Sequence, residues 1–310
     1  RGRSGGWRSR PRHRGGRLPR EQIVAPAITL ASEGFEVNRH TPRSLRWQRH
    51  WVLATSAMDH FAPGGQLAEE GDRVRHPALA ATLRTLASEG PDAFYRGAIG
   101  DELVALARDA GSRITGADLA SYRVEERQPI VTEWADHSIY APPAPSAGGI
   151  LLQQVLRMYP PGDLKQLGHN SGAYLHVLAE SFRGSIDDRM LAIGDPAYIR
   201  VDAAALAAPA RMRRRRALID RQVTRPFGAF QLDEGTANVV VVDSEGNAAV
   251  VTSSLNDMFG ARVFSDSGIV LNNALASFTT PKEEERFGAG RRPNRPKGGA
   301  RPVTSATPVS

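Results

Sequence analysis

The spacing of apolar residues predicts that the large N-terminal part of the chain is mostly helical. Apolar positions recur every three or four residues, which is the period of a helix with one buried face. The pattern predicts helices over residues 22–34, 76–87, about 95–110, 114–122, 174–190 and 203–216, with short helices and loops over 35–75. Two strands are expected near 129–133 and 137–141, followed by a Pro/Ser/Gly loop over 142–149 and a helix that begins at Ile150.

A different pattern follows in the C-terminal part, where two β-branched apolar runs flank a polar turn. The turn contains Gly246 and Asn247, which are typical of a β-hairpin. The first run includes four valines at 239–242 and does not alternate with polar residues, so we expect both faces of its strand to be buried. Residues 264–273 predict another turn and a buried strand. Residues 281–302 are rich in Pro, Gly, Arg and Lys and predict a long exposed loop.

Thr236 stands at the start of this hairpin, directly after Gly235. A hydroxyl residue that follows glycine at the head of such a strand is where N-terminal-nucleophile hydrolases carry a catalytic threonine. The structural alternative is a core hairpin in which Thr236 only caps the strand. Hairpin chemistry alone favours this alternative.

The charge of the chain is unevenly distributed. Its 40 Lys and Arg residues against 33 Asp and Glu residues give a formal net charge of +7. Eight of the arginines lie within residues 1–20, which contain no acidic residue, so the rest of the chain is nearly neutral. We therefore expect residues 1–17 to form a disordered Arg/Gly-rich arm, and we expect no specific binding of nucleic acid.

The composition excludes several chemistries. The chain contains no cysteine, which excludes disulfides, thiolate metal sites and a cysteine nucleophile. No apolar run reaches the length of a membrane span, and no signal peptide is visible. The localisation stays unknown, because the absence of cysteine is compatible with the cytoplasm and with an oxidising compartment.

Three polar clusters each allow a functional and a structural interpretation. The carboxylates at 187–188 could be acid/base or metal-binding groups, but ion pairs with Arg183 and Arg189 are the commoner explanation. The arginine run at 211–216 could contact nucleic acid, but a solvated helix face is the simpler interpretation. The glycine pair at 148–149 could present backbone N–H groups to an anion, although such loops are more often rigid connectors.

Taken together, the chain resembles the γ-glutamyltransferase family over most of residues 18–310. The most specific matches, in the family's order, are Gly235-Thr236, Val241-Val242-Asp243 with Gly246-Asn247-Ala248, Asn256-Asp257-Met258-Phe259-Gly260, and residues 267–273. The resemblance implies an α/β (α+β) fold, the four-layer αββα sandwich of N-terminal-nucleophile hydrolases, which we expect to be incomplete at both ends. Residues 18–235 would form a mostly helical large-subunit-like part. Residues 236–310 would form a truncated small-subunit-like part that starts at the nucleophile.

The family matures by cutting its own chain, and the resemblance puts the cut between Gly235 and Thr236. The Thr236 hydroxyl would attack the Gly235 carbonyl. The freed α-amino group, with a reference pKa of about 7.7–8.0, would then act as base for the hydroxyl. The nucleophile would attack a γ-glutamyl amide of the glutathione type and pass the acyl group to water or to an amino acceptor.

Other site residues follow from matching positions. Ser254 would position the nucleophile, Asn256 would contact the substrate, and Thr304 with Ser305 would lie near the oxyanion, where hydrogen-bond donors stabilise the developing charge. The resemblance implies no metal and no cofactor. The expected partners are a small γ-glutamyl or acyl-amide substrate and the two fragments themselves, which would stay associated after the cut. Family members are often periplasmic or secreted.

The chain also departs from the family pattern around its expected acyl pocket. Ala276-Ser277-Phe278 stands where the family has an acidic pair before a phenylalanine, and Ala237-Asn238 replaces the usual Thr-His. With Ser277 in the substrate-binding position, the usual carboxylate for a substrate α-ammonium group is missing. The alternatives are therefore a non-glutamyl amidase or acylase of the same family, and a catalytically inactive or truncated member.

Overall fold

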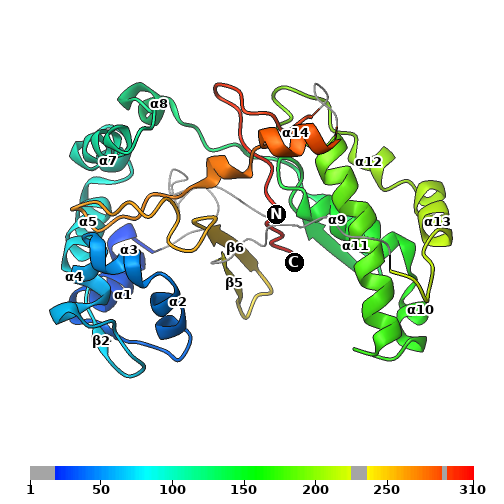
Figure 1. Cartoon of the computed structure of the whole chain (residues 1–310), viewed down its shortest axis with the longest axis horizontal. Coiled ribbons are helices and arrows are strands. Elements are labelled where there is room, and N and C mark those ends of the chain that lie inside the picture. The colour runs from blue at the N-terminus through cyan, green and yellow to red at the C-terminus, as the bar shows by residue number, and fades with distance from the viewer. Residues whose placement is uncertain (1–17, 225–235, 288–291) are drawn as a thin grey trace. The chain divides into compact units, whose positions relative to one another are not determined.

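The chain forms two compact units, each built from two separate stretches of sequence (Figure 1). The computed structural model describes residues 18–224, 236–287 and 292–310. The first unit contains residues 18–125 and Leu255–Asn273, and the second contains Glu126–Ser254 and Ala274–Ser310. The predicted cut before Thr236 therefore does not fall between the units, because the residues after it contribute to both.

The first unit is mostly helical, as the apolar spacing predicts. Its helices are α1 (Arg20–Glu33), α2 (Thr41–Trp47), α3 (Arg49–Ala54), α4 (Ala57–Phe61), the short 3-10 helix η2 (Pro63–Gly65), α5 (Pro77–Glu89), α6 (Asp92–Tyr95), α7 (Ala98–Asp109) and α8 (Gly116–Ser121). Strands β1 (Phe35–Glu36) and β2 (Arg73–Val74) pair antiparallel. The short capped helix predicted at 114–122 is α8, and its N-terminus carries a capping box in which the Thr115 and Asp118 side chains bond each other's backbone N–H groups.

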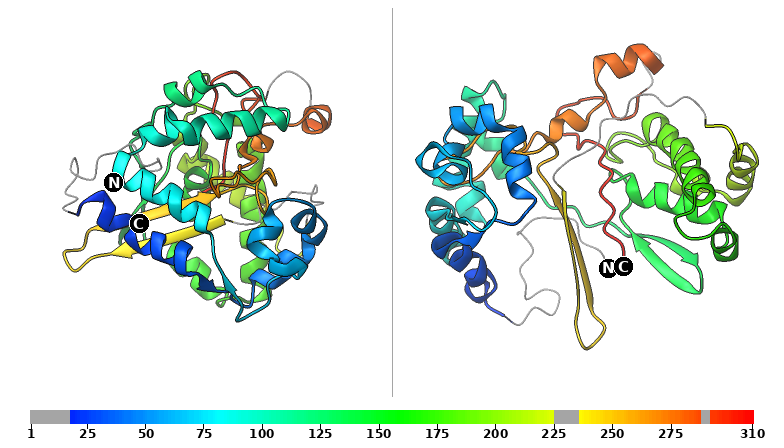
Figure 2. Two further views of the ribbon diagram at one scale, coloured as in Figure 1. Left: turned by 90° about the vertical axis from the view of Figure 1, so that its left-hand side faces the viewer. Right: turned by 60° about the horizontal axis from the view of Figure 1, so that its bottom comes forward.

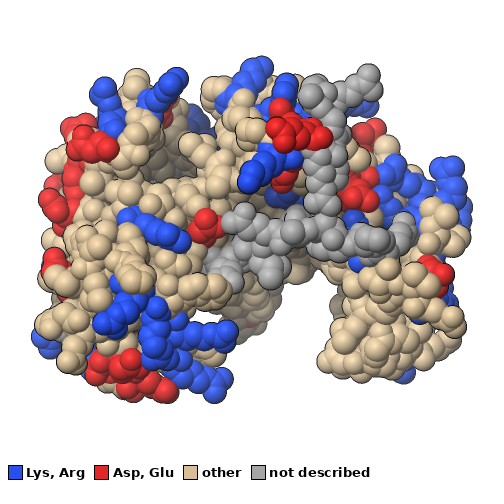
Figure 3. Space-filling model, viewed as in Figure 1, with Lys and Arg blue, Asp and Glu red and all other residues tan. Residues whose placement is uncertain are grey.

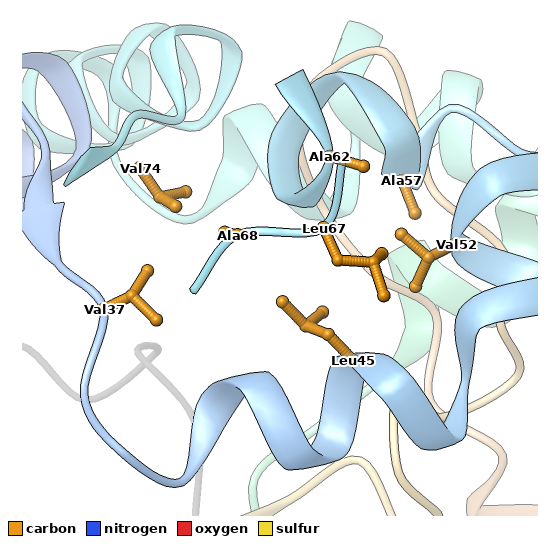
Figure 4. Close-up of a cluster of buried hydrophobic side chains, with 8 residues drawn as sticks. All are labelled: Val37, Leu45, Val52, Ala57, Ala62, Leu67, Ala68 and Val74. Atoms are coloured by element: carbon orange, nitrogen blue, oxygen red, sulfur yellow. The ribbon is translucent and has the colours of Figure 1, made fainter. Parts of the chain in front are cut away.

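The core of the first unit is a cluster of small and branched side chains between its short helices (Figure 4). It comprises Val37, Leu45, Val52, Ala57, Ala62, Leu67, Ala68 and Val74. Phe259 and Phe264, from the stretch after the hairpin, pack against this cluster beside Trp51. The Trp51 indole N–H also donates to the Arg262 carbonyl oxygen at 2.7 Å. Residues 255–273 are therefore an integral part of this core.

The second unit combines helices with two antiparallel hairpins. Its elements are β3 (Ile130–Trp134), β4 (His137–Ala141), α9 (Gly148–Met158), α10 (Pro161–Gln166), α11 (Gly172–Ala192), α12 (Ala203–Leu206), α13 (Pro209–Ala217), β5 (Thr236–Val242), β6 (Ala248–Ser254), η3 (Ala274–Ser277) and α14 (Pro281–Phe287). Helix α9 begins at Gly148, two residues before the predicted start. The predicted helix over 203–216 is divided into α12 and α13, because Pro209 has no N–H to continue the first helix.

A buried ion cluster joins α11 to its neighbours and corrects two predictions. The Asp188 carboxylate accepts hydrogen bonds from the Arg211 and Arg215 side chains of α13 and from the Gln154 side chain of α9. The predicted pairs of 187–188 with Arg183 and Arg189 are therefore wrong, because the helical period turns Asp188 toward α13. The arginine run is only partly solvated. Its exposed members lie where Lys and Arg gather over α13 in Figure 3.

The predicted hairpin is present, and its two strands form one long ribbon (Figure 2). The Asp243 carboxylate closes the turn by accepting the backbone N–H groups of Glu245 and Asn247 at 2.9 and 2.8 Å. The expectation of burial on both faces is wrong, since the four valines of β5 are 55–63% exposed. In the part of the chain that the structure describes, β5 pairs only with β6, so no further layer covers these side chains.

Two other predictions differ from the structure. The predicted turn within 264–273 is present at Gly268, which has φ 77° and donates its N–H to the Ser265 carbonyl at 3.0 Å. The predicted strand is not, since Phe264 and Val270 make only one isolated bridge across this turn. The predicted exposed loop over 281–302 contains helix α14. The Glu283 carboxylate accepts the Thr280 backbone N–H at 2.7 Å, and the Thr280 hydroxyl accepts the Glu283 N–H at 3.3 Å, so the two residues cap its first turn.

Two histidines meet among the aromatic side chains of the first unit. The Nδ1 atoms of His60 and His76 lie 3.2 Å apart, and the His60 ring stacks on Phe264 with 5.0 Å between centroids. One ring must donate this hydrogen bond and the other must accept it, so the pair holds together while the accepting ring is neutral. Burial lowers the pKa of His60 against the opposing effect of Asp59. Burial and the neighbouring His60 lower the pKa of His76.

We predict that acidification weakens the first unit through this pair. The pKa values of both histidines in the folded state lie below the ordinary 6.5. The contribution of the pair to the free energy of unfolding is therefore fully present above pH 6.5, and it falls as the pH drops from there toward the folded-state pKa values. His76→Gln should reduce the loss of thermal stability between about pH 7.5 and about pH 5.5. His50→Gln, at an exposed position of α3, should leave this loss unchanged. An identical pH dependence in wild type and His76→Gln would contradict the prediction.

Candidate active site

Thr236 is the first residue of β5, and its side chain is exposed. The antiparallel register sets it directly opposite Ser254, the last residue of β6. Residues that face each other in this way bring their side chains into contact. The Thr236 hydroxyl accordingly donates to the Ser254 hydroxyl at 3.1 Å. Gly235, the predicted upstream side of the cut, lies outside the described residues.

Thr304 and Ser305 lie in an irregular segment, residues 301–307, that runs along the start of α9. Thr304 pairs with Ser146 in a parallel bridge. The Thr304 N–H donates to the Pro145 carbonyl at 3.1 Å, and the Thr304 carbonyl accepts the Ala147 N–H at 2.7 Å. The exposed Thr304 hydroxyl donates to the Ser146 hydroxyl at 3.4 Å.

Two buried polar side chains hold the 301–307 segment from its other side. The Asp195 carboxylate accepts the Arg301 N–H at 2.7 Å. The Asn294 side chain accepts the Val303 N–H at 2.9 Å and donates to the Ser277 carbonyl at 2.7 Å. Ser277 is therefore tied through one side chain to the residue that precedes Thr304.

The segment approaches α9 so closely that only glycine fits at the first helical position. A Cβ atom on Gly148 would clash with the Thr307 hydroxyl and would lie 2.6 Å from the Ser305 carbonyl oxygen. No ordinary side chain can be accommodated at that separation. The glycine pair at 148–149 thus makes room for protein backbone, and the interpretation as a structural connector fits better than an anion site.

Asn256 belongs to the first unit, at the start of the Leu255–Asn273 stretch. Its backbone adopts the left-handed conformation with φ 77°, which asparagine tolerates better than most residues. Asp257 and Asn273 close the stretch by two reciprocal hydrogen bonds of 2.9 and 2.7 Å. The hairpin therefore brings Thr236 and Ser254 together, while Ser277, Thr304 and Ser305 form a second group and Asn256 a third position.

Sequence reasoning missed the supporting residues Ser146, Arg189 and Asn294. The Arg189 side chain donates to the Ser305 hydroxyl and to the Val303 carbonyl, both at 3.2 Å. Asn294 is 6% exposed although it lies in the predicted exposed loop. The sequence gives only a weak signal for Asn294, which is a single amide residue between Pro293 and Arg295-Pro296. Because it has no periodic apolar neighbours, it is easily assigned to a turn.

No group of three or more His, Asp or Glu side chains among the described residues could hold a metal ion. None of the described helices is both long enough and apolar enough to cross a membrane.

Comparisons with known sequences point to one family. The family model for gamma-glutamyltranspeptidase matches residues 4–310. The acylase ACY 1 proenzyme of Pseudomonas sp. (strain SE83) is 35% identical over 273 residues, which cover 85% of this chain and 48% of that protein. The glutathione hydrolase proenzyme of Escherichia coli (strain K12) is 32% identical over 274 residues, with 85% and 47% covered. The chain spans about half the length of these relatives.

Solved structures agree on the fold. The γ-glutamyltranspeptidase of Helicobacter pylori matches with a TM-score of 0.63 and 28% identity, over 70% of this chain and 62% of that chain. The cephalosporin acylase from Bacillus halodurans matches with a TM-score of 0.79 and 24% identity, over 96% of this chain and 54% of that chain. The predicted α+β class of N-terminal-nucleophile hydrolases is therefore confirmed.

We predict that Gly148→Ala destabilises the second unit by about 1–3 kcal/mol, the usual cost of overpacking a fixed contact. The added methyl group must push the 301–307 segment away from α9, so hydrogen exchange at the Thr304 amide should also accelerate. Gly172→Ala is the matched control, because a Cβ on Gly172, at the start of α11, meets no atom within 4 Å. Equal stability and equal exchange in Gly148→Ala and wild type would refute the steric argument.

Proposed function

Because the chain belongs to the γ-glutamyltranspeptidase family, we propose that it is a self-processing acyltransferase with Thr236 as its nucleophile. The observation that carries this proposal is the exposed Thr236 hydroxyl, 3.1 Å from the Ser254 hydroxyl at the base of the hairpin. Through this hydrogen bond Ser254 positions the nucleophile, because it restricts the rotation of the Thr236 side chain and so favours an attacking geometry.

Self-processing begins with attack of the Thr236 hydroxyl oxygen on the Gly235 carbonyl carbon. The peptide C–N bond breaks, the Thr236 nitrogen takes up the proton, and an ester joins the two residues. Water then hydrolyses this ester to give a Gly235 carboxylate and a free Thr236 α-amino group. Its reference pKa of about 7.7–8.0 allows it to accept a proton from the neighbouring hydroxyl near neutral pH.

Turnover repeats the same chemistry on a bound amide. The hydroxyl oxygen of Thr236 attacks the acyl carbon, the proton passes through the α-amino group to the leaving amine, and the acyl group remains as an ester on Thr236. Water or an acceptor amine then attacks the ester and restores the hydroxyl. The exposed hydroxyls of Thr304 and Ser305 donate to an anionic oxygen of the acyl donor, for which Thr304 exchanges its 3.4 Å hydrogen bond to Ser146.

The leading donor is a γ-glutamyl amide of the glutathione type, such as the donors that the name glutathione hydrolase indicates for the Escherichia coli relative. Ser277 favours a second candidate. Its position carries a hydroxyl instead of a carboxylate, so a donor α-ammonium group would lack an ionic partner there. An uncharged acyl amide avoids that cost, because it leaves no charge to be desolvated without a partner. The second candidate is therefore an acylase.

The two fragments should stay together after the cut. Phe259 and Phe264 pack in the core of the first unit, and Val303 is completely buried with Ile150 and Leu151 in the second. The fragment that starts at Thr236 therefore contributes to both hydrophobic cores. Its release would expose apolar surface in each of them.

We predict that the purified protein cuts itself into fragments of residues 1–235 and 236–310. Thr236→Ala should remain uncut, because it lacks the attacking oxygen, and Ser254→Ala should cut about tenfold or more slowly, reflecting the lost hydrogen bond and orientation. Gel electrophoresis with intact-mass measurement would resolve the fragments. Size-exclusion chromatography of the cut protein should show that they co-elute. A wild-type chain that stays whole would remove the proposal and favour a catalytically inactive member.

A second prediction separates the two donor classes. If Ser277 marks an acyl pocket without a charge for the α-ammonium group, Ser277→Asp should improve kcat/KM for a γ-glutamyl anilide by about tenfold, the value of one charge-assisted hydrogen bond. Ser277→Asp should not improve kcat/KM for an uncharged acyl anilide. Ser244→Asp, in the hairpin turn, controls for the added charge. A wild-type preference for the uncharged donor would overturn the γ-glutamyl assignment in favour of the acylase.

A further inference from the structure

We propose that Arg189 is a positioning residue that commits the Ser305 hydroxyl to donate its proton toward an anionic oxygen of the acyl donor. The role deepens the proposed function and rests on it. Arg189 lies near the end of α11, away from the hairpin in sequence, and its side chain reaches the 301–307 segment.

The guanidinium group of Arg189 spans Thr304. Its Nε atom donates to the Ser305 hydroxyl oxygen and its Nη2 atom donates to the Val303 carbonyl oxygen, each at 3.2 Å. One planar group therefore fixes a side chain and a backbone group on the two sides of Thr304. Lysine cannot reproduce this arrangement, since its ammonium group is a single point with no fork.

The chemistry of the contact sets the direction of the Ser305 hydrogen bond. A guanidinium group remains protonated and carries donors only, so the Ser305 oxygen must accept from Arg189. Its own O–H is then directed to another acceptor. Ser305 is exposed, so that acceptor can be a ligand oxygen. The nearby positive charge favours an oxygen that carries negative charge, either a donor carboxylate or the oxyanion formed during acyl transfer.

Both ends of the contact belong to firmly held parts of the second unit. Asp188, the residue before Arg189, is buried and bonded to Arg211, Arg215 and Gln154. At the other end, the Val303 side chain is completely buried and its N–H is bonded to Asn294. Neither end needs to become ordered when a substrate binds, which makes the Ser305 hydroxyl a preorganised donor.

A double-mutant cycle tests the role. Arg189→Met and Ser305→Ala should each lower kcat/KM of the self-cut enzyme on the order of tenfold, the value of one hydrogen bond to a charged group. Arg189→Met in the Ser305→Ala background should have almost no further effect, because Arg189 acts through that hydroxyl. Arg189→Lys should recover part of the loss. Rates are expressed per cut molecule, so that slower processing does not count as slower turnover.

Two donors distinguish the sources of the negative oxygen. A rise in KM restricted to a donor with a free carboxylate assigns the Ser305 hydroxyl to that carboxylate. A fall in kcat for this donor and for an uncharged acyl anilide assigns it to the oxyanion. Both results support the role of Arg189, because each requires a hydroxyl that donates to the acyl donor.

Arg216→Met is the matched control, because Arg216 is also half-buried and donates to a backbone carbonyl, that of Met158, at 3.1 Å. It should lower the melting temperature without lowering kcat/KM. Additive losses of kcat/KM in the Arg189→Met/Ser305→Ala double variant would overturn the role of Arg189, and so would unchanged kinetics in Arg189→Met alone. In either case, cleavage and turnover by the wild type would still support the proposed function. A wild type with neither activity would overturn both.

Discussion

Where α9 begins, the Thr307 hydroxyl and the carbonyl oxygens of Ser305 and Ala306 lie against Gly148 and leave no space for a Cβ atom. Beside this contact, Thr304 forms a parallel bridge with Ser146. The backbone position of Thr304 and Ser305 thus depends on this close approach, while the Arg189 side chain holds the Ser305 hydroxyl. Such a contact is stiff, because peptide groups have few soft torsions.

An irregular segment in this position has to satisfy its own backbone polar groups, since no ladder or helix does so for it. Asp195, Asn294 and Arg189 meet that requirement for Arg301 and Val303. The same side chains explain why a tail rich in proline, glycine and arginine packs closely against the protein. Their polar atoms replace the water that an exposed loop would use.

The local part of this architecture could be predicted from the sequence. The hairpin, the helices of the first unit and the facing of Thr236 and Ser254 all follow from patterns within about twenty residues. Ser146 and Thr304 are 158 positions apart, and their pairing has no periodic signature. For the valines of β5, the local pattern predicts a buried strand, but the valines are exposed. Burial also requires a neighbouring layer, and among the described residues β5 pairs only with β6.

Because the stretches of the two units alternate along the sequence, the proposed cut would change how the stability of the protein depends on its concentration. Before it, unfolding involves one molecule, and the chain connection keeps the 255–273 and 274–310 stretches close to their partners. After it, complete unfolding releases two molecules, so the midpoint depends on protein concentration and dilution favours the unfolded side. Maturation would thus leave the native contacts in place while making their loss hard to reverse. If the proposed cut occurs, formation of both cores is therefore favoured while the chain is still whole.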